Sequence, residues 1–530
     1  SVSAFLLNRS SDLVSSMSKT IIIIGAGLAG LSAALQAAEN GCNVKLVSSL
    51  PSERAQSVMA EGGINAALNT KDENDSPEEH FTDTIKAACG LADPNAVWGM
   101  TQAAPELVHW LLKLGVKFNM SGYDDVDLRN FGGQKKKRTA FAQSDTGKQI
   151  MTAMIDAVRR KEASGMVERF SHHSFLTLRL CGNICCGCVI RDEYSQETVE
   201  LPGDAVIVAT GGMHGLFGNT TGSLSNTGEV TAELFRLGVP LANGEMIQYH
   251  PTTVKCGGKR MLISEAARGE GGRLFAMKDG KQWYFMEEKY PELGNLMPRD
   301  ITAREIWKVS HESEVFLDMT EISEEIISNK LSGLADDCMT YLHKDIRKEP
   351  VSVLPGIHYF MGGILVDEQH RTPIQNLYAA GECCAQYHGA NRLGGNSLLG
   401  ALYGGRVAAK SACEQADVVD LSCATQIDFP PASQISEIKQ LNKVMQETMG
   451  VVRNENTLLN GIQTVQALTG NLPLLGMAVL KSALARKESR GAHWREDYPK
   501  SNDDDYLKTT VARFDGKQIQ ISFVPVPERR

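Results

Sequence analysis

The stretch TIIIIGAGLAG, residues 20–30, decides the fold of this chain. Its four consecutive isoleucines are typical of a strand that is buried on both faces of a parallel sheet. Three glycines then open a segment rich in Ala and Leu that we predict to be helical, and residues 43–48 (NVKLVS) predict a second strand. A strand, a glycine-rich turn, a helix and a second strand in this order predict a βαβ unit of the Rossmann type.

The same glycines predict a nucleotide ligand. Gly25 permits a tight turn, Gly27 lets backbone amides approach a pyrophosphate, and Gly30 allows the helix to pack closely against the strand. The helix N-terminus adds the positive end of its dipole. Because the second strand ends at Ser48 and Ser49 rather than at the usual acidic residue, we expect a hydroxyl or the backbone to contact the ribose.

Length and composition narrow the class of protein. At 530 residues the chain exceeds one ordinary core and suggests about three or four folding units. Hydrophobic residues at 42% and charged residues at 22% lie in the globular range, which excludes disordered, collagen-like and coiled-coil proteins. The net charge of −9 disfavours nucleic acid as a partner. The twelve cysteines are irregularly spaced, which favours a reducing compartment, and no apolar run predicts a transmembrane helix.

Short apolar runs alternate with turns between residues 175 and 212, which predicts a small antiparallel meander that returns to the first sheet. Four cysteines lie there, at Cys181, Cys185, Cys186 and Cys188. Because alternate residues of a strand face opposite ways, we interpret them as buried structural thiols rather than as a metal site.

Three further features receive structural interpretations. The run 135–138 (KKKR) is interpreted as a solvated face. Cys383 and Cys384 are expected to pack against the nucleotide fold, because adjacent cysteines form a bridge only with strain. His388 is interpreted as a packing residue rather than as a base.

Several glycine-marked segments follow one another along the chain. They are SVMAEGGINAA (57–67), NFGGQKKKRTAFAQSDTG (130–147), ATGG (209–212), NTGE (226–229), MIQYHPTT (246–253), SEAARGEGG (264–272), MPRD (297–300), GIHYFMGGI (356–364), LYAAGE (377–382) and HGANRLGGNSLLGALYGG (388–405).

These segments carry cations that suit a small dianion: Arg268, Arg299, Arg392, His250 and His358. Arginine gives permanently charged, bidentate recognition of a carboxylate, and histidine gives a donor whose protonation can vary. A single arginine of this kind more often forms an internal ion pair, here with Glu265, Glu270 or Asp300. The joint pattern with both histidine motifs favours a ligand site.

As an ordered set, these segments resemble the flavoprotein subunit of the succinate dehydrogenase/fumarate reductase family, of which aspartate oxidases are close relatives. The resemblance covers nearly the whole chain, from Thr20 through SRGAHWREDYP (489–499). It implies an α/β fold with a discontinuous Rossmann-like FAD-binding domain, an inserted α+β capping domain and a C-terminal helical domain. The expected regions are an N-terminal extension (1–16), the FAD-binding domain (17–241 and 356–430), the capping domain (242–355), the helical domain (431–490) and an irregular charged tail (491–530).

The resemblance implies FAD-dependent interconversion of fumarate and succinate, in which hydride passes between flavin N5 and the substrate. Arg299 would be the proton donor and acceptor, and Glu265 and Arg268 would relay protons to it from solvent. An arginine pKa is ordinarily about 12.5 or higher, so we expect Arg299 to be crowded by cations and coupled to Glu265. The implied substrate-binding residues are His250, Ser264, His358 and Arg392.

The cofactor implied by the resemblance is FAD. Its implied contacts are Gly25, Ala26, Gly27, Leu28, Ala29, Gly30, Ser48, Ser49, Ser57, Ala60, Glu61, Gly62, Gly63, Ala209, Thr210, Gly211, Glu229, Glu382, Ser397 and Leu398. NAD is the alternative ligand for the first motif alone, but it leaves the AAGE and GANRLGGNSL segments unexplained. No metal site is expected.

Two positions depart from patterns within the family. Many members carry a histidine, bonded covalently to the flavin, six residues before the first glycine of the EGG or QGG motif; this chain has Gln56 there. An amide cannot form that bond, so we expect non-covalent FAD and a bias toward fumarate reduction. Aspartate oxidases carry a carboxylate where this chain has Phe131, which cannot pair with a substrate ammonium group.

The expected partners are a small dicarboxylate and a separate iron–sulfur subunit, because no convincing iron–sulfur motif is present in the chain. Membrane contact is expected only through partner subunits, with a location in the cytoplasm or at the inner membrane face. The alternatives that stay open are an L-aspartate oxidase, a reductase of another unsaturated carboxylic acid, and a flavin-bearing assembly or binding subunit without turnover.

Overall fold

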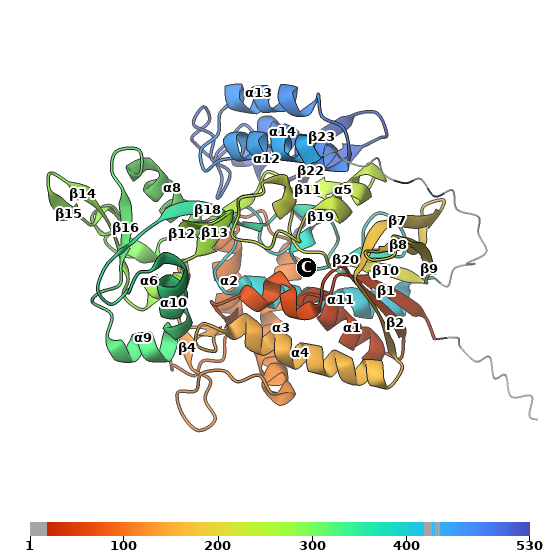
Figure 1. The fold of residues 1–530 in the computed structure, drawn as a ribbon, viewed down its shortest axis with the longest axis horizontal. Helices are drawn as coiled ribbons and strands as arrows, with labels where there is room; N and C mark the ends of the chain where they lie inside the picture. The colour runs from red at the N-terminus through yellow and green to blue at the C-terminus, as the bar shows by residue number, and fades with distance from the viewer. Residues whose placement is uncertain (1–17, 418–426, 428, 430–434) are drawn as a thin grey trace, which may run out of the picture.

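The computed structural model describes residues 18–417, 427, 429 and 435–530. Figure 1 shows a lower body that contains the parallel sheet, a green lobe at one side from the middle of the chain, and a blue C-terminal layer above. Within the described ranges, no helix is both long and apolar enough to cross a membrane. The predicted extension (1–16) and the predicted boundary at 430/431 lie outside these residues.

The TIIII segment forms β1 (Thr20–Ile24), the central strand of a five-stranded parallel sheet ordered β20-β10-β1-β2-β6. The expected Rossmann-like architecture is confirmed. It is also discontinuous, because β20 comes from a segment far later in the chain. The other four strands are β2 (Asn43–Ser48), β6 (Val167–Ser171), β10 (Ala205–Val208) and β20 (Leu377–Ala379).

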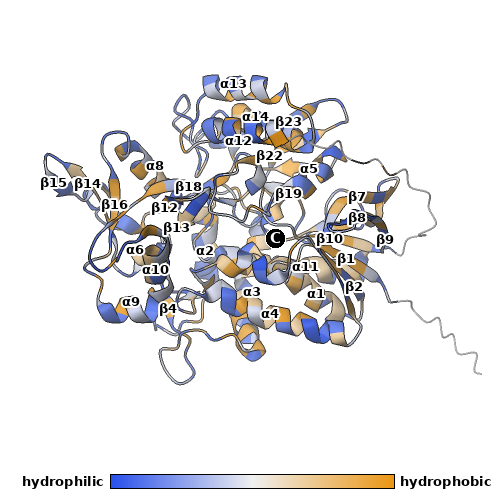
Figure 2. Cartoon of the chain, viewed as in Figure 1, coloured by the Kyte–Doolittle hydropathy of each residue, from blue (hydrophilic) through white to orange (hydrophobic). Residues whose placement is uncertain are grey.

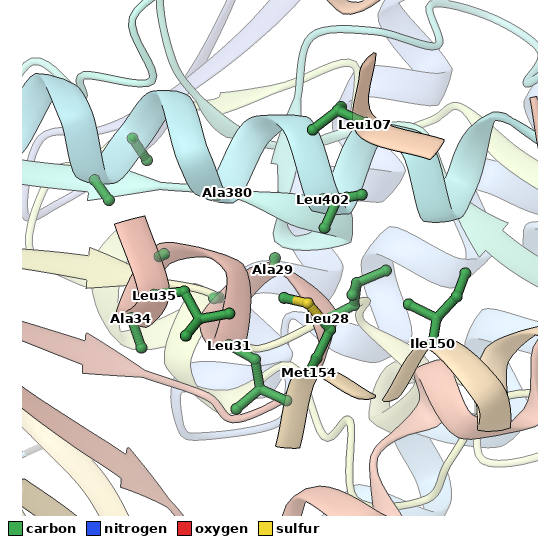
Figure 3. Close-up of a cluster of buried hydrophobic side chains, with 14 of the residues drawn as sticks. Leu28, Ala29, Leu31, Ala34, Leu35, Leu107, Ile150, Met154, Ala380 and Leu402 are labelled. Carbon is green, nitrogen blue, oxygen red and sulfur yellow. The ribbon is translucent and has the colours of Figure 1, made fainter. Parts of the chain in front are cut away.

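The alternation of side chains along β1 separates two cores. Ile21 and Ile23 pack into a core formed with helices, whereas Ile22 and Ile24 pack into a core formed with the antiparallel meander. Figure 3 shows part of the helical core, where Leu28 lies near Met154 and Ala29 faces the helix that carries Leu402. The helices of this body are α1 (Leu28–Glu39), α2 (Pro77–Ala87), α3 (Pro94–Leu114), α4 (Thr146–Ala163) and α11 (Asn396–Gln415).

The predicted meander is confirmed as the antiparallel sheet β7 (His173–Cys181), β8 (Ile184–Asp192) and β9 (Thr198–Pro202). Cys185, Cys186 and Cys188 are free, fully buried thiols, as expected. The prediction of a buried thiol is wrong for Cys181, which is disulfide-bonded. Among the described residues, no group of His, Cys, Asp or Glu side chains could hold a metal ion.

A small sheet contacts α11 through β3, and two 3-10 turns lie against α4. They are η1 (Ser52–Arg54), η2 (Gln56–Met59), β3 (Ile64–Asn65), β4 (Leu128–Arg129) and β5 (Thr139–Ala140). Arg138 directly precedes β5 and is fully buried, with Nη2 2.8 Å from Asp75 Oδ1 and 3.0 Å from Asp83 Oδ2. The interpretation of 135–138 as a solvated face is therefore wrong for Arg138, because α2 and the loop before it supply buried carboxylates.

The middle of the chain builds a second lobe with its own apolar core, which includes Leu274, Phe285 and Leu317. Its two sheets are ordered β13-β12-β18 and β15-β14-β16-β17. Its strands are β12 (Ile247–Cys256), β13 (Lys259–Leu262), β14 (Arg273–Lys278), β15 (Lys281–Trp283), β16 (Val315–Asp318), β17 (Val351–Ser352) and β18 (Leu354–Phe360). Its helical elements are α6 (Glu265–Gly269), α7 (Phe285–Lys289), η4 (Gly294–Leu296), α8 (Arg299–Val309), α9 (Glu324–Lys330), α10 (Ser332–Asp337) and the π-helix η5 (Cys338–Leu342).

The C-terminal layer begins with α12 (Ile435–Thr448), α13 (Glu455–Val465) and α14 (Asn471–Ala485). Figure 2 shows the hydrophobic residues of α14 beneath α13, where they pack against α5 (Glu229–Arg236) and η3 (His214–Leu216). The tail is not irregular as expected. It contains α15 (Asp503–Tyr506) and a hairpin, β22 (Lys508–Phe514) with β23 (Ile519–Pro525).

That hairpin completes a five-stranded sheet, β21-β19-β11-β22-β23, because β22 pairs with β11 from a distant part of the chain. Residues 519–523 (IQISF) alternate between apolar and polar side chains, but the strand with which the hairpin pairs lies outside the tail. The remaining elements are β11 (Leu241–Ala242), β19 (Gly363–Leu365), η6 (Gly381–Cys383) and β21 (Cys384–Ala385).

Candidate active site

A cavity of about 590 Å³ opens at the carboxyl ends of β1 and β10 and extends to the middle lobe. This edge is where ligands bind in open parallel sheets, since the chain leaves neighbouring strands in opposite directions there. Gly25 follows β1 and Ala209 follows β10, and a Cβ at Gly25 would lie 2.2 Å from the Ala209 carbonyl oxygen. Glycine at 25 is therefore required by close backbone packing and by its φ of +110°.

The cavity brings together almost all of the predicted site residues. The predicted cofactor contacts that line it are Gly25, Ala26, Gly27, Leu28, Ala29, Ser48, Ser49, Ser57, Ala60, Glu61, Gly62, Gly63, Ala209, Thr210, Gly211, Glu229, Glu382, Ser397 and Leu398. The predicted substrate and proton-transfer residues that line it are His250, Ser264, Glu265, Arg299, His358 and Arg392. Gln56 and Phe131 line it as well.

Gly30 and Arg268 are the two predicted residues that lie behind the wall. A Cβ at Gly30 would lie 1.8 Å from the Gly25 carbonyl oxygen, so glycine here allows the close packing of α1 against the turn. Arg268 is 3% exposed and donates from Nη1 to the Asn295 carbonyl oxygen at 2.7 Å. Its link to the cavity passes through Glu265.

The part of the cavity wall at the carboxyl ends of β1 and β2 suits a dinucleotide. The N-cap of α1 is Gly27, which carries no side chain, and a Cβ there would meet no atom nearer than 3.6 Å, so the protein itself does not require glycine at this position. The first turn of α1 therefore faces open space with the positive end of its dipole. Buried Ser48 Oγ makes no hydrogen bond within the described residues, which fits a hydroxyl that hydrogen-bonds to a ligand.

Arg299 is held at the wall by three hydrogen bonds. Its Nε and Nη2 donate to Glu265 Oε2 at 2.8 and 2.6 Å, and its Nη1 donates to Gln248 Oε1 at 3.1 Å. Arg299 is the first residue of α8, where the helix dipole disfavours a cation. The Glu265 carboxylate compensates for that position and fixes the plane of the guanidinium.

Glu265 is 2% exposed and joins three elements. Its Oε1 accepts a hydrogen bond from the Gly132 backbone at 3.0 Å and lies 3.5 Å from Arg268 Nη2, one helical turn along α6. Burial by itself would raise the pKa of Glu265, but Arg299 and Arg268 together hold that pKa below its usual value. The carboxylate is therefore ionised at neutral pH.

Two histidines and a second arginine complete the polar wall. The rings of His250 and His358 lie 5.2 Å apart, centroid to centroid, in an edge-to-face arrangement. Burial, followed by the charge of Arg299, holds the pKa of both histidines well below the usual value, so both imidazoles are neutral at pH 7. Burial and the same arginine lower the pKa of Arg392 to about 9. The wall thus carries two guanidinium groups and two neutral imidazole donors.

Phe131 forms the apolar side of the same cavity and is 2% exposed. It packs so closely on Gly62 and Gly394 that a Cβ at either position would lie 2.9 or 3.0 Å from its ring. Ser264 caps α6, since its Oγ accepts from the Ala266 backbone at 3.4 Å. Glu382 Oε1 accepts from the Phe360 backbone at 3.0 Å, and Glu229 lies at the exposed rim.

Three residues of the site were not predicted. Gln248, fully buried, donates from Nε2 to Asn391 Oδ1 at 3.0 Å and to the Arg392 carbonyl oxygen at 2.8 Å, so it links Arg299 to the Arg392 loop. Tyr359 lies with its ring centroid 4.4 Å from Arg392 Cζ, and Thr221 Oγ1 lies 2.8 Å from His358 Nδ1. The two-residue period from His250 back to Gln248 could have identified Gln248. No signal in the neighbouring sequence identifies Thr221.

Comparison with known proteins agrees with this geometry. A family model described as an FAD binding domain matches residues 20–398, and one described as fumarate reductase flavoprotein C-term matches residues 468–529. The chain is 38% identical to a succinate dehydrogenase flavoprotein subunit of Bacillus subtilis, with 96% of this chain and 98% of the relative covered. It is 32% identical to the 8-methylmenaquinol:fumarate reductase flavoprotein subunit of Wolinella succinogenes, with coverage of 96% and 92%.

A solved structure of quinol fumarate reductase from E. coli superposes with a TM-score of 0.86 at 27% identity, covering 96% of this chain and 97% of that one. The match runs through the parallel sheet, the middle lobe and the C-terminal layer. The chain therefore belongs to the succinate dehydrogenase/fumarate reductase flavoprotein family, and it is an FAD-dependent oxidoreductase.

Proposed function

We propose that this chain reduces fumarate to succinate as the flavoprotein subunit of a reductase complex, with Arg299 as the proton donor. The observation that carries the proposal is the guanidinium of Arg299, held at the cavity wall by Glu265 and Gln248. A proton donor must be held in one orientation toward the reacting carbon, and three hydrogen bonds from one side chain provide that orientation.

The substrate class follows from charge. Arg299, Arg392 and the buried Arg268 carry three positive charges against the one negative charge of Glu265, and both histidines are neutral. The resulting net charge of two balances the two carboxylates of fumarate. Phe131 supplies no acceptor for an ammonium group, so an amino acid such as aspartate would lose hydration there without compensation. This contrast favours a dicarboxylate without an amine over the substrate of an L-aspartate oxidase.

FAD, when bound, supplies hydride transfer to the substrate. The residues of the chain then donate the proton and replace it. When Arg299 gives a proton to the substrate carbon, the ionised Glu265 carboxylate can take up a proton from the Arg268 side and pass one to Arg299, whose Nε and Nη2 already lie within hydrogen-bond distance of Oε2. Arg268 Nη2 lies 3.5 Å from Oε1, the other oxygen of Glu265, and would continue the relay toward solvent. The neighbouring charges of Arg268 and Arg392 favour loss of a proton from Arg299.

We further propose that FAD is held without a covalent bond and that the reaction is biased toward fumarate reduction. Gln56 occupies the position of the linking histidine, and an amide cannot attack the flavin methyl group. Precipitation of the purified protein in acid should release all yellow colour to the supernatant. Colour that remains in the washed pellet would contradict the non-covalent proposal.

The electron donor is expected to be a separate iron–sulfur subunit, because the relatives are named flavoprotein subunits and no metal-binding group occurs in the described part of this chain. Membrane contact would then come through partner subunits. Co-purification of the chain from its native source, followed by iron analysis and mass spectrometry, tests this. A flavoprotein that is fully active with the cell's own donor in the absence of any iron protein would overturn it.

The main test is turnover with reduced viologen. We expect oxidation of the dye upon addition of fumarate, little oxidation with other unsaturated acids that lack one carboxylate, and no oxygen uptake with L-aspartate. A flavin-loaded protein that fails to oxidise the dye with fumarate would refute the proposed function. Oxygen uptake with L-aspartate would support the oxidase alternative instead.

A further inference from the structure

Two cysteines that lie 371 positions apart in sequence meet at the amino edge of the parallel sheet. Cys42 directly precedes β2, and Cys413 lies in the last turn of α11. Their Sγ atoms are 2.8 Å apart, closer than unbonded sulfur atoms ordinarily approach, and both are free thiols. This edge is opposite to the one that carries the cofactor cavity, since the cavity follows the carboxyl ends of β1 and β10.

The surroundings activate one thiol of the pair. The contact with Cys413 and, against burial, the charge of Lys19 lower the pKa of Cys42. Lys19 is fixed in place, since its Nζ donates to the Cys413 carbonyl oxygen at 2.8 Å. The pKa of Cys413 is raised by the same sulfur contact and by burial. Cys42 therefore loses its proton more readily than Cys413, and the thiolate is the form that attacks a disulfide.

Access also differs between the two sulfurs. Cys42 is 5% exposed, whereas Cys413 is only partly buried at the end of its helix. The other cysteines of the parallel-sheet region contrast with this pair. Burial raises the pKa of Cys185 and Cys188, and both are fully enclosed between the meander and the sheet, so they are inert toward a polar oxidant.

We propose that Cys42 and Cys413 form a reversible disulfide, a redox modification site that joins the start of β2 to the end of α11. With glutathione disulfide as oxidant, a sulfur–sulfur bond forms between the two cysteines while the sulfur–sulfur bond of the oxidant breaks. The two thiol hydrogens and the electron pair leave as two molecules of glutathione. No other co-reactant is required.

The bond would stabilise the body that holds the cofactor. α1, which leads into Cys42, and α11 pack against each other so closely that a Cβ at Gly405 would lie 2.3 Å from the Ala29 carbonyl oxygen. The N-terminal turns of both helices line the cavity through Leu28 and Leu398. A cross-link at their far ends restricts the unfolded chain and opposes separation of the two helices, which should raise the thermal unfolding midpoint by about 5 °C.

The test uses the full chain loaded with FAD and equilibrated in glutathione buffers from fully reduced to fully oxidised. Free thiols are then blocked with N-ethylmaleimide, and the protein is cleaved with trypsin and an enzyme that cuts after glutamate. Cys42 is released in NGCNVK (40–45) and Cys413 in SACE (411–414), so each can be assigned without interference from other cysteines. We expect the linked pair NGCNVK–SACE in oxidising buffer and its loss in reducing buffer.

Three variants make the outcome decisive. Cys42→Ser and Cys413→Ser should abolish both the linked peptide and the rise in unfolding midpoint, whereas the control Cys89→Ser, which changes another partly buried free thiol, should retain both. Dye-linked activity at 25 °C should be unchanged in all three, since none of these cysteines lines the cavity. Complete labelling of Cys42 and Cys413 in oxidising buffer would overturn the proposal, as would glutathione attached to either one in place of the bond.

Discussion

Replacing Arg299 by lysine tests whether the rigid geometry of the guanidinium, rather than positive charge alone, serves proton transfer. Arg299 donates three hydrogen bonds, two to Glu265 and one to Gln248. The single Nζ of a lysine at this shorter reach can keep one of these contacts. The change also removes a planar fork that matches a carboxylate in a bidentate manner.

The expected loss can be calculated in two ways. Two lost hydrogen bonds to a charged group amount to about 3–6 kcal/mol. A positioned general acid contributes about 10²–10⁴ in rate, or about 3–5 kcal/mol of activation free energy. We therefore expect kcat for fumarate reduction to fall by about 10²–10⁴ while FAD stays bound. A lysine pKa of about 10.4 would make it the stronger acid, so acidity alone predicts the opposite change.

The assay is oxidation of reduced viologen by fumarate, with the FAD content of each preparation measured by absorbance. Arg273→Lys is the matched control, because Arg273 also pairs with a glutamate in two hydrogen bonds, to Glu287 at 2.8 and 2.7 Å, but lies outside the cavity wall. The control should retain activity within about twofold. If Arg299→Lys also keeps kcat within tenfold of the unmodified protein, the assignment of Arg299 as proton donor is wrong.

Three further predictions follow from buried contacts. Gln248→Leu should lower kcat by about tenfold or more and shift KM less, because the amide orients Arg299 and the Arg392 loop; an unchanged kcat would exclude this role. The kcat/KM for fumarate should fall as pH rises through about 9, since Arg392 is protonated below its pKa of about 9 and loses its charge above it; a flat profile from pH 8 to 10 would contradict this. Arg138→Ala should lower the free energy of unfolding, measured in urea, by about 3–5 kcal/mol, because Asp75 and Asp83 would stay buried without a positively charged partner. The control Lys135→Ala, at the exposed end of the same run, should change that free energy by less than about 0.5 kcal/mol.

The local sequence determined the elements whose signals are contained in short segments. The isoleucine run predicted β1 and NVKLVS predicted β2, both with the observed limits, and the glycines predicted the turn and a helix after it, which is α1. Such signals are local because burial on both faces of a parallel strand selects β-branched residues, and a tight turn selects glycine. The motifs also identified most of the cavity wall, because a segment that approaches a ligand closely needs glycine and polar donors in the same few residues.

Only the tertiary structure decided which residues face one another. Gly30 and Arg268 lie behind the cavity wall, and Arg138 is buried between two aspartates although its cationic run predicted a solvated face. The C-terminal hairpin depends on pairing with β11, a strand more than 250 positions earlier. These outcomes depend on contacts between distant segments, and the energy of a buried charge or an unpaired strand is set by the partner that the fold brings to it.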